Sequence, residues 1–415
     1  MRVLWVVNTL MPEVAERFGM TSGHAISWVA AMSVCLKRRD DMELAIVSPV
    51  KNTTQFKNEL DGIVYYFVCR NSSVNEWQHI LDNFDPDIIH VYGTEWGHAL
   101  PLIKMHQEVP IVISLQGLLT EYQRFYYAGM DVTTILKNIT FRDLIKGTII
   151  HDRRDFQKRA VREQEMLRSV KYVEGRTAWD RVSAMRINPE LTYYHCPRLL
   201  RDAFYHQRKW KMESAEPHSI FVHQGMYPIK GLHIMLEALQ LLRNKYPDVK
   251  MYVAGNDRIS CPTFKQKLKR NGYAKYVKKL IDRWNLGSSV FFTGFLDAEK
   301  MADRLLRSNV MVIPSAIENA PNSLAEAEVL GVPCVASYVG GNPEMLRDGQ
   351  DGFLYCYNEP ALLADKIGKI FDNPDLAQRF SESAREFALK RHDPATLERT
   401  LVGIYEDILL KEGKL

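Results

Sequence analysis

The chain has 415 residues, of which 46% are hydrophobic and 25% charged, and this balance is typical of a soluble globular protein with two domains of ordinary size. Its 54 basic and 50 acidic residues leave a net charge of only +4, which is too small to indicate a nucleic-acid-binding protein. No apolar run is long enough for a transmembrane helix, and the start MRVLWVVNTLMPE resembles a buried strand more than a secretory signal, so we expect a cytoplasmic protein.

Residues 2–117 alternate short apolar runs with segments of helical period. The apolar runs are RVLWVVNTL, MELAIVSP, DGIVYYFVC, PDIIHVYG and PIVISLQG. Because most of them are continuously apolar, they predict strands covered on both faces, as in a parallel sheet flanked by helices. Residues 118–170 interrupt the pattern with segments that indicate helices, and the alternation then resumes.

A polar and basic stretch over 206–217 predicts a linker, and a second alternating series follows it. Its apolar runs include SIFVHQG, VKMYVAG, VFFTGFL, NVMVIPS and PCVASY. We therefore predict an α/β protein with two doubly wound, Rossmann-like parallel-sheet domains, over 1–205 and 218–395. Ligands of such sheets bind beyond the carboxyl ends of the strands, so we expect a cleft between the two domains.

The stretch IENAPNSLAE, residues 317–326, follows one of these predicted strands. Its proline suits the first turn of a helix, and Gly331 suits the position just past the helix end. The backbone N–H groups of Asn322, Ser323 and Leu324 are then expected to be unpaired and to attract a phosphate or diphosphate. Two carboxylates beside a diphosphate repel it, so Glu318 and Glu326 are expected to contact hydroxyl groups.

The stretch ENAPNSLAEAEVLGVPCVASYVGGNPEMLRDGQDGFLY resembles the acidic signature of the family 4 glycosyltransferases. GMYPIKGLHIMLEAL is similar to the phosphate-contacting loop of that family, DPDIIHVYG to its N-domain strand, and VFFTGFL to its base-binding strand. The similarity is closest from residue 219 to about 355. It implies the GT-B fold, with the two domains facing across a cleft and a C-terminal helix over 396–415 that packs on the N-terminal domain.

The resemblance also implies an activity and a set of roles. The activity is retaining transfer of a hexose or N-acetylhexosamine from a nucleotide sugar, with UDP favoured, to a glycan or lipid-linked glycan in bacterial polysaccharide assembly. No metal and no cofactor are implied, because the nucleotide sugar is a substrate. Glu318 and Lys230 are the implied catalytic residues. The implied donor-binding residues are Gly225, Lys230, Phe295, Leu296, Glu318, Asn322, Ser323, Leu324 and Glu326.

These residues have separate implied tasks. Glu326 would hold the ribose hydroxyls, Glu318 the hydroxyls of the donor sugar, and Lys230 the diphosphate, while the backbone near Phe295 and Leu296 would hold the base. A departing nucleoside diphosphate gains negative charge, which a lysine and helix amides stabilise. Attack on the same face, with the leaving phosphate accepting the acceptor's proton, is the simplest mechanism for retention, and a covalent intermediate on Glu318 is an alternative.

The chain departs from the family pattern at two positions. Met226 follows Gly225 where the family usually has an arginine, so a further cation such as Arg176 is expected to assist Lys230. Gln116 stands where many members carry a histidine, and its side chain is suited to hydrogen bonding with a sugar but not to proton transfer.

Other positions allow two interpretations. Gly23 and His24 either face the cleft or only begin a helix. Gly340 and Gly341 form either a plain turn or a contact with the sugar. Residues 137–168 carry nine basic and five acidic residues, so they form either a peripheral contact with an anionic membrane or a solvated charged face.

Three other functions compete with glycosyl transfer. An NAD-dependent oxidoreductase is disfavoured, because no GxGxxG follows the first predicted strand. A nucleotide-sugar epimerase or hydrolase on the same fold would turn over the donor without any acceptor. A non-catalytic nucleotide-sugar binder is the third possibility, because Met226 and Gln116 depart from the family pattern.

Overall fold

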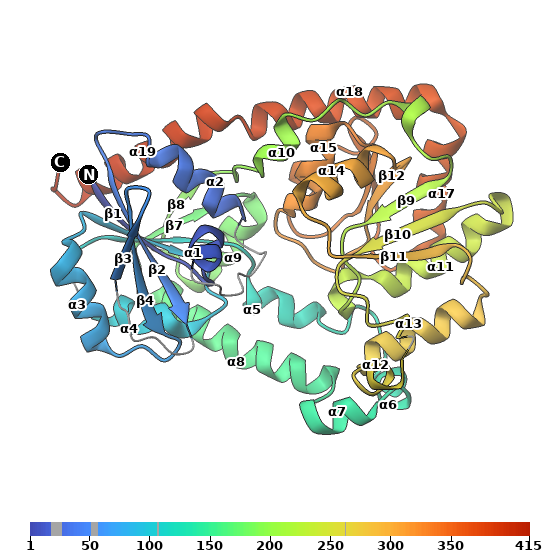
Figure 1. Ribbon diagram of the computed structural model, residues 1–415, viewed down its shortest axis with the longest axis horizontal. Helices are drawn as coiled ribbons and strands as arrows, with labels where there is room; N and C mark the ends of the chain where they lie inside the picture. The colour runs from blue at the N-terminus through green and yellow to red at the C-terminus, as the bar shows by residue number, and fades with distance from the viewer. Residues whose placement is uncertain (18–26, 51–56, 106–107, 262) are drawn as a thin grey trace. The chain divides into compact units, whose positions relative to one another are not determined.

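The computed structural model describes residues 1–17, 27–50, 57–105, 108–261 and 263–415 (Figure 1). The chain divides into two compact units. Unit 1 comprises residues 1–121, 156–201 and 392–415, and unit 2 comprises residues 122–155 and 202–391. Of the described helices, none combines the length and the apolar character needed to cross a bilayer.

Unit 1 is built on an eight-stranded sheet with the order β3-β4-β2-β1-β5-β6-β7-β8. Its strands are β1 (Arg2–Val6), β2 (Glu43–Val50), β3 (Lys57–Leu60), β4 (Ile63–Cys69), β5 (Ile88–Tyr92), β6 (Ile111–Ser114), β7 (Tyr172–Gly175) and β8 (Thr192–His195). All pairs are parallel except β3 with β4, which form a hairpin at the sheet edge. The sequence analysis did not anticipate β3, because the segment Lys57–Leu60 is polar and half-exposed. Asp61 and Gly62 both have positive φ, as the tight hairpin turn requires.

The helices of unit 1 include the last helix of the chain. They are α1 (Pro12–Arg17), α2 (Ser27–Leu36), α3 (Val74–Phe84), α4 (Leu100–Lys104), α5 (Leu119–Tyr122, its last residue in unit 2), the second part of α8 (Ile149–Arg168), α9 (Ala178–Ile187) and α19 (Pro394–Lys411), with a 3-10 turn η2 (Gly97–Ala99). The buried Tyr405 of α19 accepts a hydrogen bond from Trp5 Nε1 of β1 at 3.0 Å. The expected packing of the C-terminal helix on the first domain is therefore confirmed.

Unit 2 is built on a six-stranded parallel sheet with the order β11-β10-β9-β12-β13-β14. Its strands are β9 (Ser219–Val222), β10 (Lys250–Ala254), β11 (Val290–Gly294), β12 (Val310–Ile313), β13 (Cys334–Ser337) and β14 (Gly352–Tyr355). Its helices are α6 (Val132–Lys137), α7 (Phe141–Lys146), α10 (Asp202–Tyr205), α11 (Leu232–Lys245), α12 (Phe264–Leu268), α13 (Gly272–Arg283), α14 (Ala298–Leu306), α15 (Asn322–Leu330), α16 (Asn342–Met345), α17 (Pro360–Asp372) and α18 (Pro374–Arg391), with 3-10 turns η3 (Gln123–Phe125), η4 (Met212–Ser214) and η5 (Pro228–Lys230). The two sheets confirm the predicted fold class of two doubly wound α/β domains.

Residues 122–155 lie in unit 2, whereas the boundaries expected from sequence grouped them with residues 1–205. The carbonyl of Ala128 accepts hydrogen bonds from His233 Nε2 and from Tyr357 Oη, each at 2.8 Å. Burial lowers the pKa of His233 to about 4, so its ring is neutral at pH 7. Buried contacts with residues distant in sequence therefore decide where this helical segment belongs.

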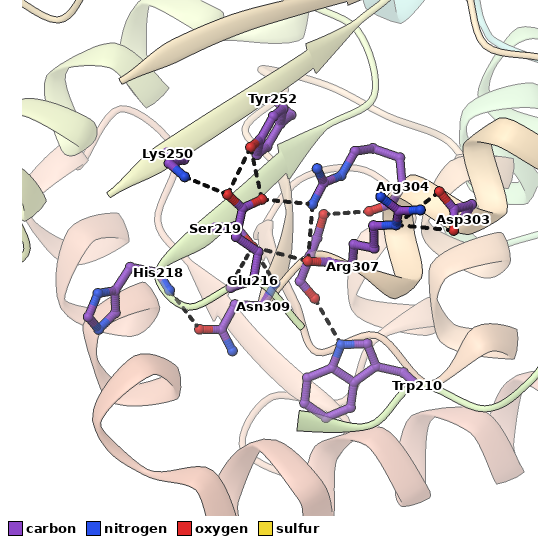
Figure 2. Close-up of polar contacts among 11 residues, drawn as sticks. Trp210, Glu216, His218, Ser219, Lys250, Tyr252, Asp303, Arg304, Arg307 and Asn309 are labelled. Carbon is purple, nitrogen blue, oxygen red and sulfur yellow. Dashed lines mark hydrogen bonds and ion pairs between the residues drawn. The ribbon is translucent and has the colours of Figure 1, made fainter. Parts of the chain in front are cut away.

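The stretch expected to be a linker is packed into unit 2. Trp210 is fully buried, and its indole nitrogen donates to the carbonyl of Ser308 at 2.8 Å (Figure 2). The carboxylate of Glu216 accepts from Lys250 at 2.7 Å and from Tyr252 at 2.8 Å (Figure 2). Although burial opposes ionisation, these bonds hold the pKa of Glu216 below its ordinary value. Glu216 lies just before β9, and Lys250 is the first residue of β10. This cluster therefore lies at the amino-terminal ends of the strands and stabilises that edge of the sheet.

Candidate active site

The loops that carry the candidate residues of unit 2 follow two neighbouring strands. The order of this sheet runs outward from β9 to β11 on one side and from β12 to β14 on the other. Such a reversal of strand order opens a crevice at the carboxyl ends of the two central strands, where ligands of doubly wound sheets bind. The loop after β9 leads to Lys230, and the loop after β12 contains Glu318. Both predicted residues therefore lie on loops at this reversal of strand order.

Lys230 and Glu318 form an ion pair. The distance from Lys230 Nζ to Glu318 Oε1 is 2.5 Å, and Ser315 Oγ donates to the same oxygen at 2.7 Å. The side chain of Lys230 is 20% exposed and that of Glu318 8% exposed. Burial opposes the lysine charge, but the facing carboxylate outweighs it and raises the pKa of Lys230, so the lysine is charged. From the sequence, Lys230 was expected to contact the diphosphate and Glu318 the donor sugar. A direct ion pair between the two side chains was not predicted.

The backbone of the Glu318 loop is held by the Gly340-Gly341 turn and by Tyr122. The Gly341 N–H donates to the carbonyl of Glu318 at 3.1 Å, and the Asn319 N–H donates to Tyr122 Oη at 2.9 Å. Gly340 has φ 53°, and a Cβ there would lie 1.8 Å from the Glu318 carbonyl oxygen. The amide of Gly341 is thus bonded to the loop, which favours a positioning role for this turn over direct sugar contact.

Helix α15 begins beside this loop, with Pro321 as its N-cap. The N–H of Leu324 donates to the carbonyl of Pro321 at 2.9 Å. The expectation that this N–H is unpaired is therefore wrong, because the first turn is tight enough for an i to i−3 bond. Asn322 and Ser323 are half-buried, and Glu326 is buried one turn into the helix. Their predicted roles toward phosphate and ribose stay predictions.

The remaining predicted donor-binding residues of unit 2 lie at the same edge of the sheet. Phe295 and Leu296 follow β11, and Phe295 is 68% exposed. Gly225 is buried in the loop after β9, where a Cβ would lie 2.6 Å from Leu232 Cδ2. Only a residue without a side chain fits this position without displacing Leu232, which explains the glycine.

Two of the predicted cleft residues of unit 1 contact each other. The Arg176 guanidinium donates to the backbone carbonyl of Gln116, and the Arg176 N–H donates to Asp180 Oδ2 at 2.8 Å. Arg176 is buried within unit 1, so its predicted part in binding a diphosphate stays a prediction. Gly23 and His24 lie outside the described residues.

The sequence analysis did not identify Asn8 and Glu95, which lie at the corresponding reversal of strand order in unit 1. Asn8 follows β1 and Glu95 follows the neighbouring strand β5. Asn8 Nδ2 donates to Glu95 Oε2 at 2.8 Å, and the Gly117 N–H donates to Glu95 Oε1 at 3.3 Å. Burial, with a contribution from Glu163, raises the pKa of Glu95 to about 7. The available signal was that Asn8 directly follows the apolar run VLWVV and that Glu95 lies in the loop just after the run IIHVY.

Comparison with known proteins shows which proteins this chain resembles. Residues 206–387 match the family model described as "Glycosyl transferases group 1". Over 161 residues the chain is 30% identical to D-inositol 3-phosphate glycosyltransferase of Streptomyces scabiei, a match that covers 39% of this chain and 35% of that protein. A match to N-acetyl-alpha-D-glucosaminyl L-malate synthase of Bacillus anthracis is 28% identical and covers 34% of this chain and 36% of that protein. The chain thus spans about a third of the length of these curated relatives.

Solved structures resemble nearly the whole chain. Sucrose-phosphate synthase from Thermosynechococcus elongatus has a TM-score of 0.73 at 14% identity, covering 99% of this chain and 100% of that one. Anabaena Alr3699/HepE, solved in complex with UDP, has a TM-score of 0.68 at 15% identity, covering 98% and 100%. At these identities the likeness establishes the shared fold of both units. The family match adds that residues 206–387, less than half of this chain, are similar to the group 1 glycosyltransferases.

Proposed function

We propose that the protein is a metal-independent, retaining glycosyltransferase that moves a hexose or N-acetylhexosamine from a nucleotide sugar, preferably a UDP-sugar, to a glycan or lipid-linked glycan. The observation that carries the proposal is the Lys230–Glu318 pair at the reversal of strand order, beside the start of α15. The family match and the UDP complex of the HepE fold relative support it.

The pair suits the charge changes of the reaction. A diphosphate beside Lys230 competes with Glu318 for the ammonium group, which frees carboxylate oxygens to accept hydrogen bonds from sugar hydroxyls. As the bond from the anomeric carbon to the phosphate oxygen breaks, negative charge grows on the leaving diphosphate, and Lys230 stabilises that charge. The acceptor oxygen bonds to the anomeric carbon on the same face, and its proton passes to the leaving phosphate.

A donor panel tests the reaction. The protein is incubated with UDP- and GDP-sugars, with and without glycan acceptors, and release of the nucleoside diphosphate is measured. Acceptor-dependent release supports the proposal. Release without acceptor indicates a hydrolase, conversion of the sugar without release an epimerase, and binding without turnover a nucleotide-sugar binder.

A single substitution tests the predicted ribose contact. Loss of charge-assisted hydrogen bonds in Glu326→Ala is expected to weaken donor binding about tenfold or more, measured by calorimetry. Glu299→Ala, which removes an exposed carboxylate from α14, serves as the control. Equal donor affinity of wild type and Glu326→Ala would contradict the ribose assignment.

The proposal places the enzyme at the cytoplasmic face of an anionic membrane, with residues 137–168 as the contact. In support, α7 and the end of α6 expose Leu136, Phe141, Leu144 and Ile145 among basic residues. Apolar side chains among cations are typical of a surface that rests on anionic lipid. Sedimentation with anionic vesicles is expected to be salt-sensitive, and absence of binding at low salt would remove this contact.

A further inference from the structure

A cavity lies in unit 2, apart from the Lys230–Glu318 pair. Its volume is about 620 Å³, and it is formed by α7, by α12 with the residues after it, and by the loop that follows β10. Figure 1 shows α6, α7, α12 and α13 gathered at one end of this unit. The lining side chains that matter for its chemistry are Arg142, Lys146, Asp257, Arg258, Lys269 and Arg270.

The lining of the cavity has an excess of positive charge. Among the described residues that line it, five are basic and one, Asp257, is acidic, and Arg142 is paired with Asp143 at 3.4 Å. The carboxylate of Asp257 already accepts the N–H groups of Ile259 at 2.7 Å and Ser260 at 3.0 Å. Within the described ranges, Lys146, Arg258, Lys269 and Arg270 form no ion pair. Clustered cations that form no ion pair are suited to an anion with more than one charge.

The walls of the cavity are joined by hydrogen bonds. Thr140 Oγ1, at the start of α7, donates to the carbonyl of Arg270 at 2.8 Å, and Lys275 Nζ donates to the carbonyl of Ile139 at 3.0 Å. Arg270 Nη2 donates to the carbonyl of Ile259 at 2.7 Å and so holds the loop after β10. A Cβ at Gly272 would lie 2.9 Å from Asp143 Oδ2, so α7 and α13 approach closely. The cavity is therefore preformed, which lowers the entropic cost of binding.

The rim of the cavity is apolar. Phe141, Leu144 and Ile145 of α7 are 63%, 74% and 66% exposed, on the same short helix as Arg142 and Lys146. Leu268 of α12 is also exposed. A fully soluble anion gains nothing from these side chains, whereas hydrocarbon next to the head group covers them.

We propose that this cavity binds the phosphomonoester or diphosphate head group of an amphiphile, with Phe141, Leu144 and Ile145 against its hydrocarbon part. This inference rests on the proposed function and makes it more specific, since it names the chemistry that anchors a lipid-linked acceptor. Asn256 of the cavity follows β10 at the edge of the sheet that also carries the loops of Lys230 and Glu318. A head group in the cavity is thereby held at the carboxyl edge of the sheet, where the donor is proposed to bind.

Vesicle binding with paired charge variants tests the site. The triple variant Lys146→Gln, Arg258→Gln, Lys269→Gln removes two lysines and one arginine from the cavity. The control triple variant Lys369→Gln, Arg379→Gln, Lys390→Gln removes the same residue types from exposed positions on α17 and α18. Full-length proteins are sedimented with phosphatidylcholine vesicles that contain phosphatidic acid, a phosphomonoester lipid, or phosphatidylglycerol, a phosphodiester lipid, at matched surface charge.

The expected result is at least tenfold tighter binding to the phosphatidic acid vesicles than to the phosphatidylglycerol vesicles. The cavity triple variant is expected to lose this preference and the control triple variant to keep it. Leu144→Ser with Ile145→Ser, a change at exposed positions, is expected to weaken binding to both vesicles while leaving the affinity for inorganic pyrophosphate unchanged. That affinity is measured by calorimetry and is expected to fall only in the cavity triple variant.

Two outcomes would overturn the proposal. Equal binding of all variants to both vesicles would mean general electrostatic adsorption. Pyrophosphate binding to the cavity without preference for the phosphomonoester lipid would mean a site for a soluble anion. Donor turnover is assayed separately with a soluble glycan acceptor, so vesicle binding without turnover would contradict the proposed function and leave the lipid site standing.

Discussion

Among single residues, Lys230 and Glu318 are the most informative pair, because they form an ion pair and both are largely shielded from water. Lys230→Met is expected to lower the free energy of unfolding by about 2 kcal/mol, since it leaves the Glu318 carboxylate without its cation. The double variant Lys230→Met, Glu318→Gln removes the orphaned charge as well and is expected to regain part of that loss. Urea unfolding of the two single variants and the double variant measures this coupling. A double variant with a loss equal to the sum of the single losses would contradict it.

A second prediction at the scale of single residues concerns Glu95 and the dependence of stability on pH. Its folded pKa of about 7 lies above the ordinary carboxyl value of 4.5, so the folded protein binds a proton that the unfolded chain has released between these values. As pH rises above 4.5, the free energy of unfolding of the wild-type protein therefore falls, because the unfolded chain ionises Glu95 more readily than the folded protein does. Relative to wild type, Glu95→Gln is expected to gain up to about 3 kcal/mol of stability between pH 4.5 and pH 8.

Chemical denaturation at pH 4.5 and pH 8 measures this difference. Glu190→Gln removes an exposed carboxylate from the same unit and is the matched control. A stability difference between wild type and Glu95→Gln that does not change with pH would argue against the shifted pKa.

At the scale of elements, the Gly340-Gly341 turn supports the loop of Glu318. Gly340→Ala combines a positive φ with a clash against the Glu318 carbonyl, whereas Gly349→Ala has a positive φ of 72° and no atom within 4 Å of its Cβ. Gly349→Ala is expected to cost about 1 kcal/mol of stability and Gly340→Ala about 2 kcal/mol or more. Only Gly340→Ala is also expected to weaken donor binding, as titration calorimetry would show. Equal effects of the two variants would mean that the turn does not position Glu318.

At the scale of the whole molecule, the chain passes between two units that each have their own sheet. Trp210→Ala is expected to destabilise unit 2 by about 3–5 kcal/mol, because it empties a fully buried site and removes the bond to Ser308. Amide hydrogen exchange should then accelerate in β9 and β12 and stay unchanged in β1. Trp96→Ala, at an exposed tryptophan of unit 1, is the control and is expected to cost less than about 1 kcal/mol. Acceleration in both units alike would mean that they unfold as one.

The sequence by itself determined most of the strands and helices, the two sheets and the region of the candidate site around residues 225–230 and 318–326. Buried strands and helix faces give the sequence a periodic pattern of apolar residues, from which these elements can be predicted. In the segment 317–331, the proline and glycine at its ends predict the helix from local sequence alone. The edge strand β3 could not be predicted, because its polar, half-exposed residues show no periodic apolar pattern.

Only the tertiary structure decided which groups meet. It joined Lys230 to Glu318 across 88 positions of sequence, bonded the Gly341 amide to the Glu318 carbonyl, and gave Leu324 a partner in Pro321. It brought residues 122–155 to unit 2 and formed the basic cavity from helices more than a hundred residues apart. The periodic pattern of apolar residues predicts that a side chain is buried, but it does not predict which residues bury it. Pairing, pKa shifts and cavities depend on the neighbours that folding brings into contact.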